Sequence, residues 1–140
     1  MAVSKDQLEK FIQTVLEIKS SKRSVVHSPD DLKQIAFEMG FTEDDWQEYL
    51  REYQKHLTAG RSFLEHNNPG DAALHLEKAV TLHPYGLEAN ALLAETYKQQ
   101  FLKTRKKSDK NKAIEQARNC LKIDNKHAAA YQLISELKQT

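Results

Sequence analysis

Apolar residues recur along this chain at intervals of three and four positions, which is the spacing of one face of an α-helix. Alternation with a period of two, the signature of strands, is nearly absent, and only four glycines and three prolines interrupt the chain. The pattern predicts an all-α protein. Its first apolar stripe consists of Leu8, Phe11, Ile12, Val15 and Leu16.

Two helices are predicted within the first forty residues. Ser4 with Gln7 forms a candidate capping box for the first of them. Ser28, Pro29 and the two aspartates that follow predict the start of the second, because a hydroxyl cap, a proline in the first turn and early carboxylates all favour a helix N-terminus. Gly40 is the expected end of this helix, since glycine readily adopts the left-handed terminating conformation.

A third helix is predicted to begin at Thr42, which Asp45 complements as a cap. No breaker follows before residues 67–69, Asn-Asn-Pro, so we expect this helix to run unbroken to about residue 66. The alternative is a joint near residues 53–56. The inward face predicted for this helix is Trp46, Tyr49, Leu50 and Tyr53.

Residues 35–46, IAFEMGFTEDDW, have the outline of a DNA-binding helix-turn-helix. A recognition helix needs basic or amide side chains that face phosphates and base edges. Residues 42–53 instead carry five carboxylates and one arginine, a net charge of −4 that would repel phosphate. The sequence therefore argues against DNA binding.

The composition limits the possible partners and compartments. With 21 basic and 20 acidic residues, the chain has a net charge of +1 and no overall field that would attract nucleic acid or an acidic membrane. One cysteine cannot form an internal disulfide, and no apolar run has the length of a membrane span or of a signal-peptide core. We expect a soluble, cytoplasmic protein.

The C-terminal part of the chain repeats itself. Residues 59–63, Ala-Gly-x-x-Phe, recur as residues 93–97, Leu-Ala-x-x-Tyr, at an offset of 34. A second group of residues, within 72–84, recurs within 113–125 at an offset of 41. The difference predicts a seven-residue insertion, which we place in the charged stretch 103–112. The second group pairs Ala72, Leu76 and Ala79 with Ala113, Ala117 and Cys120.

The residue sizes in the repeat are those of closely packed helix pairs. Three small residues take equivalent positions where one helix of a pair must approach its partner, and Phe63 and Tyr97 are expected to fill the gaps beside them. Pro84 is expected to end its helix. The small residues are Gly60, Ala94 and Ser135.

On these residues the chain resembles the tetratricopeptide repeat family, whose 34-residue unit is a helix-turn-helix. The resemblance covers about sixty per cent of the chain. Ala117 and Asn125 depart from it, because they replace a large residue and a proline, and the turn between the helices of the second repeat is long.

The resemblance implies a right-handed superhelical stack of helical hairpins. It assigns residues 54–86 to a first repeat, 87–127 to a second repeat with the seven-residue insertion, and 128–140 to a capping helix. Residues 1–53 lie outside the resemblance, and we infer that they pack on the repeats as a three-helix N-terminal cap, because two repeats alone bury little apolar surface.

In this family the first helices of successive repeats line a groove that binds a peptide or helix of another protein. The resemblance places twelve residues of this chain there: Leu57, Arg61, Leu64, Glu65, Glu88, Ala91, Leu92, Glu95, Lys98, Gln99, Gln132 and Glu136. Chaperone-binding members grip a C-terminal carboxylate with a clamp of Lys, Asn and Arg. Leu57, Ala91 and Gln132 stand at clamp positions here, which argues against chaperone tails.

Two further hypotheses remain open beside groove binding. A basic loop could bind a polyanion, either RNA or a phosphoprotein, although no aromatic residue is interleaved for base stacking and a solvated turn is the simpler interpretation. Alternatively, residues 1–53 could dock a regulatory subunit on an enzyme. The basic loop consists of Lys103, Arg105, Lys106, Lys107, Lys110 and Lys112.

Catalytic and metal-binding motifs are not evident. The histidines lack the spacing of a metal motif, and Cys120 lies at a packing position where we expect it to be buried. We therefore expect a non-catalytic adaptor or scaffold without metal or cofactor, a monomer or weak dimer whose partner is another protein or peptide. The histidines are His27, His56, His66, His75, His83 and His127.

Overall fold

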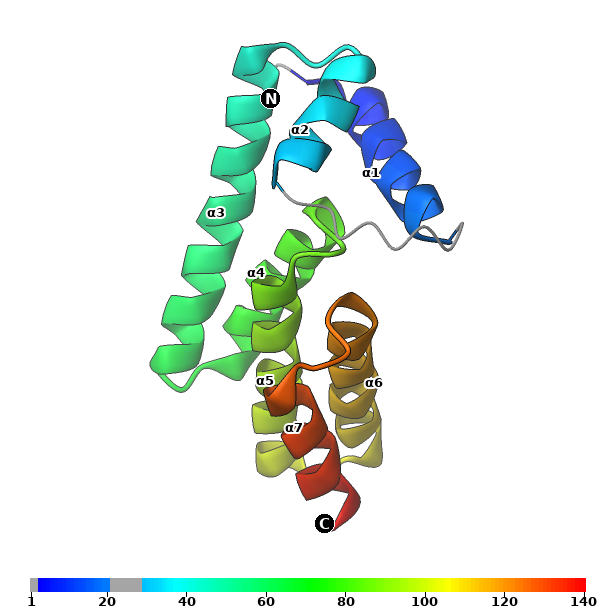
Figure 1. The fold of residues 1–140 in the computed structure, drawn as a ribbon. Helices are drawn as coiled ribbons and strands as arrows, with labels where there is room; N and C mark the ends of the chain where they lie inside the picture. The colour runs from blue at the N-terminus through cyan, green and yellow to red at the C-terminus, as the bar shows by residue number, and fades with distance from the viewer. Residues whose placement is uncertain (1–2, 21–28) are drawn as a thin grey trace.

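The structure, a computed structural model, describes residues 3–20 and 29–140. These residues form seven helices and no strand, so the all-α prediction is confirmed (Figure 1). The predicted cap at Ser28 lies outside the described residues. The helices are α1 (Lys5–Ser20), α2 (Pro29–Glu38), α3 (Glu43–Glu65), α4 (Pro69–Leu82), α5 (Leu87–Thr104), α6 (Lys107–Ile123) and α7 (Ala128–Lys138).

Local signals fix several helix ends as predicted. The hydroxyl of Ser4 accepts a hydrogen bond from the main-chain N–H of Gln7 at 3.1 Å. Thr42 and Asp45 form both halves of a capping box at the start of α3, over 3.1 and 2.9 Å. Gly40, which follows α2, has φ +96°, a conformation that a side chain would strain.

Helix α3 runs unbroken for 23 residues, so the alternative of a joint near residues 53–56 is wrong. The helix therefore crosses the boundary drawn at residue 53 and belongs both to the N-terminal part and to the first hairpin. After it, Asn68 caps α4 by accepting from the N–H of Asp71 at 3.2 Å, and Pro69 occupies the first turn.

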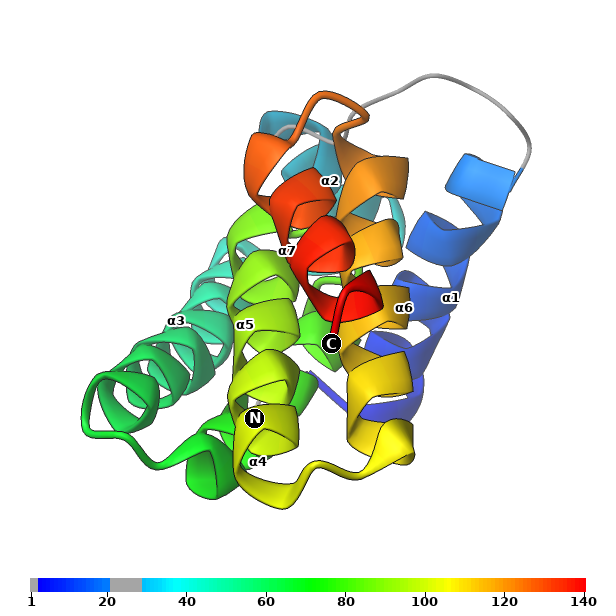
Figure 2. The same ribbon diagram turned by 90° about the horizontal axis from the view of Figure 1, so that it is seen from below.

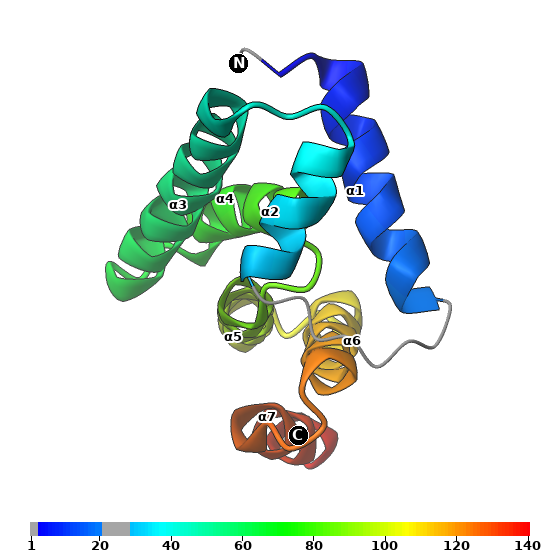
Figure 3. The same cartoon turned by 45° about the horizontal axis from the view of Figure 1, so that its top comes forward.

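The N-terminal core is aromatic. Phe11 meets the rings of Trp46 and Tyr49 edge to face, at centroid distances of 6.4 and 5.4 Å, and α2 lies between α1 and α3 (Figure 3). The hydroxyl of Tyr49 donates to the carbonyl of Leu82 at 2.7 Å, which ties this core to the end of α4. The other buried residues of the core are Val3, Val15, Leu32, Ala36 and Phe41.

Helices α3 and α4 form one antiparallel pair, α5 and α6 form another, and α7 packs on α5 and α6 (Figures 1 and 2). Small residues allow these helices to approach one another, as predicted: Ala94, Ala113 and Ala117 are all buried in one cluster. Ser135 was expected to be equivalent, but it is exposed. The buried contacts of α7 are made instead by Ala130, Leu133 and Leu137.

The stretch 103–112 is not a loop, and the predicted long turn between the helices of the second repeat is wrong. Only Arg105 and Lys106 separate α5 from α6, and Arg105 makes the turn with φ +58°. The additional residues lengthen the two helices, to 18 and 17 residues, because lysine, glutamine and alanine have high helix propensity.

Gly60 marks the closest approach of α3 to α4 and gives a test of the packing. A Cβ atom at this position would lie 2.5 Å from Cγ of the fully buried Leu76. Gly60→Ala gains about 1 kcal/mol of helix propensity, but overpacking costs about 1–3 kcal/mol, so we expect net destabilisation of about 1 kcal/mol in urea unfolding.

Gly70→Ala is the matched control, because its Cβ would have no neighbour closer than 3.9 Å. This variant should be as stable as the wild type or more stable. Equal stability of Gly60→Ala and Gly70→Ala would contradict the close approach.

Candidate functional site

The residues predicted to line a groove lie on α3, α5 and α7, and α5 contacts both of the other helices. Two ion pairs bridge these helices. Arg61 of α3 donates to Glu88 of α5, and Lys98 of α5 lies 2.9 Å from Glu136 of α7. We call this surface the α3/α5/α7 face; it carries Arg61, Glu65, Glu88, Glu95, Lys98, Gln99, Gln132 and Glu136.

The leucine side chains predicted for the groove point mostly toward the core and not toward this face. Leu57 is only 3% exposed and belongs to the core between α3 and α4, so its assignment to the groove is wrong. It faces inward because one turn of helix places it beside Tyr53 and Gly60 on the packed side. Leu64 and Leu92 are half-buried and pack against the same core.

Polar side chains of the face form hydrogen bonds with one another. Gln99 donates to Glu95 at 3.0 Å, and Gln132 donates to Glu136 at 3.0 Å. The hydrogen bond that Lys98 donates to Glu136 raises the pKa of Lys98, and the same bond, together with the one from Gln132, lowers the pKa of Glu136. Ion pairs at an exposed surface contribute little to stability, so a partner could replace them at little energetic cost.

A small hollow lies within this face, between α5 and α7. It has a volume of about 130 Å³, and alanines from both helices form half of its lining, which Glu95, Cys120, His127 and Leu133 complete. The alanine side chains leave space for one apolar group next to a carboxylate. The alanines are Ala91, Ala94, Ala129 and Ala130.

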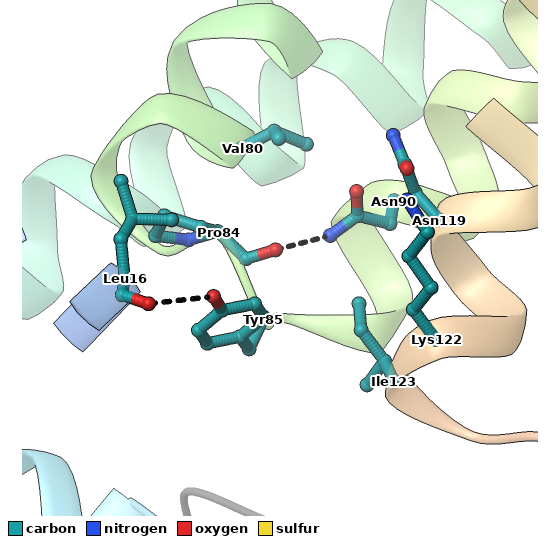
Figure 4. A pocket seen from close by; sticks show the side chains of 8 residues that line it. All are labelled: Leu16, Val80, Pro84, Tyr85, Asn90, Asn119, Lys122 and Ile123. Carbon is teal, nitrogen blue, oxygen red and sulfur yellow. Dashed lines mark hydrogen bonds between the residues drawn. The ribbon is translucent and has the colours of Figure 1, made fainter. Parts of the chain in front are cut away.

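A larger pocket, of about 490 Å³, was not predicted from the sequence (Figure 4). It lies where the end of α1, the end of α4 and the last turns of α6 meet. Side chains far apart in the sequence form it, so no local pattern could reveal it. Its lining residues are Leu16, Val80, Pro84, Tyr85, Asn90, Asn119, Lys122 and Ile123.

Asn90 forms the inner wall of this pocket and is 1% exposed. Its amide donates to the carbonyls of Pro84 and Gly86 at 3.0 and 2.8 Å, and its oxygen accepts from Gln116 at 2.5 Å. The amide group of Asn90 therefore has all its hydrogen-bond partners within the protein, and these bonds hold the α4–α5 turn against α6.

Cys120 does not have the properties of a nucleophile. It is 1% exposed, as predicted, and burial raises the pKa of its thiol to about 11. The reactive thiolate is thus scarce at neutral pH. In residues 3–20 and 29–140, no group of three or more His, Cys, Asp or Glu side chains is placed to hold a metal ion, and no helix is long and apolar enough to cross a membrane.

Two histidines, which the sequence gave no reason to pair, meet between α3 and α4. The Nδ1 atoms of His56 and His75 lie 3.0 Å apart, and Nε2 of His56 lies 3.1 Å from Glu52. A carboxylate only accepts, so Nε2 of His56 carries a proton. A neutral His56 then accepts at Nδ1, and His75 must donate from its own Nδ1.

This arrangement holds only while at most one of the two rings is charged. If both rings were protonated, two N–H groups would face each other across 3.0 Å. Phe63 stacks on His75 at 5.6 Å, and His56 is 7% exposed, so neither ring can turn away without opening the packing of α3 on α4.

Comparison with known proteins returned no match: no family model, no curated protein and no solved structure matches this chain. The resemblance to tetratricopeptide repeats therefore stays a prediction from the residues quoted above.

The histidine pair predicts how stability depends on pH. Burial lowers the pKa of His56 below its ordinary value of 6.5, although Glu52 acts in the opposite direction. Between the lowered pKa and 6.5, the unfolded chain binds more protons than the folded one, so stability rises with pH. We expect the free energy of unfolding to fall as the pH drops below about 6.5.

Urea unfolding at pH 7.5 and pH 5 checks this expectation in two variants. His56→Gln should show a smaller pH dependence than the wild type. His66→Gln, which changes the exposed histidine at the C-cap of α3, should keep the full dependence. An unchanged dependence in His56→Gln would show that the pair does not control it.

Proposed function

We propose that this chain is a non-catalytic interaction module of the tetratricopeptide type, whose α3/α5/α7 face binds a peptide or helix of another protein. The observation that carries the proposal is the pair of ion bridges, Arg61 to Glu88 and Lys98 to Glu136, which join three helices of separate hairpins into one surface. Such a face positions side chains on rigid helices, which limits the entropy lost on binding.

The chemistry of the face fits recognition of a polar segment with one apolar side chain. The face presents the exposed carboxylates Glu65, Glu88 and Glu136 beside half-buried Arg61 and Lys98, and its two ion pairs are contacts that solvent or a ligand can replace. The hollow between α5 and α7 would receive the apolar side chain, with Glu95 beside it. Affinity would come from shape and hydrogen-bond complementarity, as in other helical peptide-binding surfaces.

A photo-crosslinking experiment tests where the partner binds. A photoreactive amino acid is placed at Glu65 or Gln132 on the α3/α5/α7 face, and at Arg118 on α6 as the control; all three positions are exposed. In lysate of the source cells, the first two positions should crosslink the same discrete protein and Arg118 should not. Equal crosslinking from Arg118 would contradict the assignment of the face.

Charge reversal then separates the structural role of Arg61 from its role in binding. The double variant Arg61→Glu/Glu88→Arg keeps the ion pair, so its stability should stay within about 1 kcal/mol of the wild type. Because the charges that the partner meets are exchanged, we expect at least a tenfold loss of crosslinking yield at residue 132.

The matched control exchanges the charges of another exposed pair, Lys33 and Glu43, which joins α2 to α3 over 3.1 Å outside the α3/α5/α7 face. The variant Lys33→Glu/Glu43→Lys should retain the partner. If both charge exchanges leave the crosslinking yield unchanged, the partner does not recognise the charges of the α3/α5/α7 face, and the proposal is wrong.

A further inference from the structure

The turn between α5 and α6 gathers six basic side chains at one end of the second hairpin. They come from the last turn of α5, from the two linking residues and from the first turns of α6, and every one except the half-buried Lys110 is exposed. We call this surface the basic turn: Lys103, Arg105, Lys106, Lys107, Lys110 and Lys112.

The basic turn makes the molecule electrically asymmetric. Residues 103–112 contain six basic side chains and one acidic one, so they carry +5. The whole chain carries +1, and the remaining residues therefore carry −4. The dipoles of α5 and α6 oppose each other at this end, because one helix finishes where the other begins, so the side chains decide the local field.

Among the residues that the structure describes, no side-chain carboxylate forms an ion pair with these cations. The carboxylates pair instead with Lys33, Lys55, His56, Arg61 and Lys98. Lys103 and Lys110 donate to main-chain oxygens, of Asn67 and Thr140, at 3.0 and 2.8 Å. Asp109, the one carboxylate nearby, accepts from the hydroxyl of Thr104 at 2.5 Å.

The turn is also held in one conformation. The N–H of Arg105 donates to the carbonyl of Phe101 at 2.7 Å, and the N–H of Lys106 donates to Oγ1 of Thr104 at 3.1 Å. The ring of Phe101 lies under Arg105 and Lys110, at 5.6 and 6.0 Å from its centroid. Cations that are positioned before binding lose less entropy when a ligand arrives.

We propose that the basic turn is a docking surface for an Asp/Glu-rich segment of a partner protein. Cations on a fixed helical turn are complementary to a row of carboxylates. Leu102, which is 40% exposed beside the turn, offers an apolar contact to such a segment. The surface is separate from the α3/α5/α7 face, so this proposal does not depend on the function proposed above.

Nucleic acid fits the same surface less well. Binding of single-stranded RNA uses exposed aromatic rings on which bases stack. Phe101 is 5% exposed and covered by cations, and half-buried Tyr97 lies under Lys112 at 5.7 Å. The aromatic faces at this end are thus already occupied. The lysine-rich surface that remains attracts negative charge but offers no ring on which a base could stack.

Fluorescence anisotropy with a labelled peptide of eight alternating Asp and Glu residues tests the proposal. The full chain should bind this peptide at least tenfold more tightly than the matching Asn/Gln peptide at 50 mM NaCl. Raising the salt to 300 mM should weaken binding several-fold, because exposed charges are screened. Octauridylate of similar charge should bind more weakly than the acidic peptide.

The triple variant Arg105→Gln/Lys106→Gln/Lys107→Gln should lose at least tenfold in affinity for the acidic peptide. Glutamine preserves helix propensity, and circular dichroism confirms that each variant is folded. The control removes three exposed cations elsewhere, in Lys78→Gln/Arg118→Gln/Lys126→Gln, and should change affinity less than threefold. The variant Arg61→Glu/Glu88→Arg should bind the peptide like the wild type.

Three results would overturn the proposal. In the first, both triple variants weaken binding equally, which indicates attraction to any positive charge. In the second, octauridylate binds more tightly than the peptide, which assigns the turn to nucleic acid. In the third, light scattering shows salt-sensitive self-association that the basic-turn variant abolishes, which identifies a second copy of this chain as the occupant.

Discussion

The structure depends on the burial of one continuous face of α3. Trp46 and Tyr49 on its first half pack in the aromatic core with α1, while Leu57 and Gly60 on its second half pack against α4. Because the helix is unbroken, the two cores are rigidly connected, and the hydrogen bond from Tyr49 to Leu82 closes the junction at the far end of α4. The packing of α3 on α4 therefore sets the position of the surfaces that the later helices form.

Charge is distributed differently on the two candidate binding surfaces. On the α3/α5/α7 face, Arg61 and Lys98 each pair with a carboxylate of a neighbouring helix, so the cations of the face are neutralised within the protein. At the basic turn, cations rest on aromatic rings and main-chain oxygens and keep their charge. The first arrangement favours recognition by shape and hydrogen bonds, and the second favours attraction that depends on salt.

Features that local chemistry dictates were predictable from the sequence. The capping box of Thr42, the glycine stop at Gly40 and the start of α4 at Asn68 each depend on residues within one turn of helix. The close approach at Gly60 was also predictable, because the repeat placed small residues at equivalent positions and small residues admit a second helix. The burial of Cys120 followed from the same argument.

By itself, then, the sequence determined the helical class, most helix boundaries and the small residues at which helices pack, because period, capping and side-chain size act over a few positions. Only the tertiary structure decided that Leu57 belongs to the core and that His56 meets His75. The pocket beside Asn90 likewise exists only in three dimensions. These features depend on which helix faces which, and that is settled by the burial of surfaces that are distant along the chain.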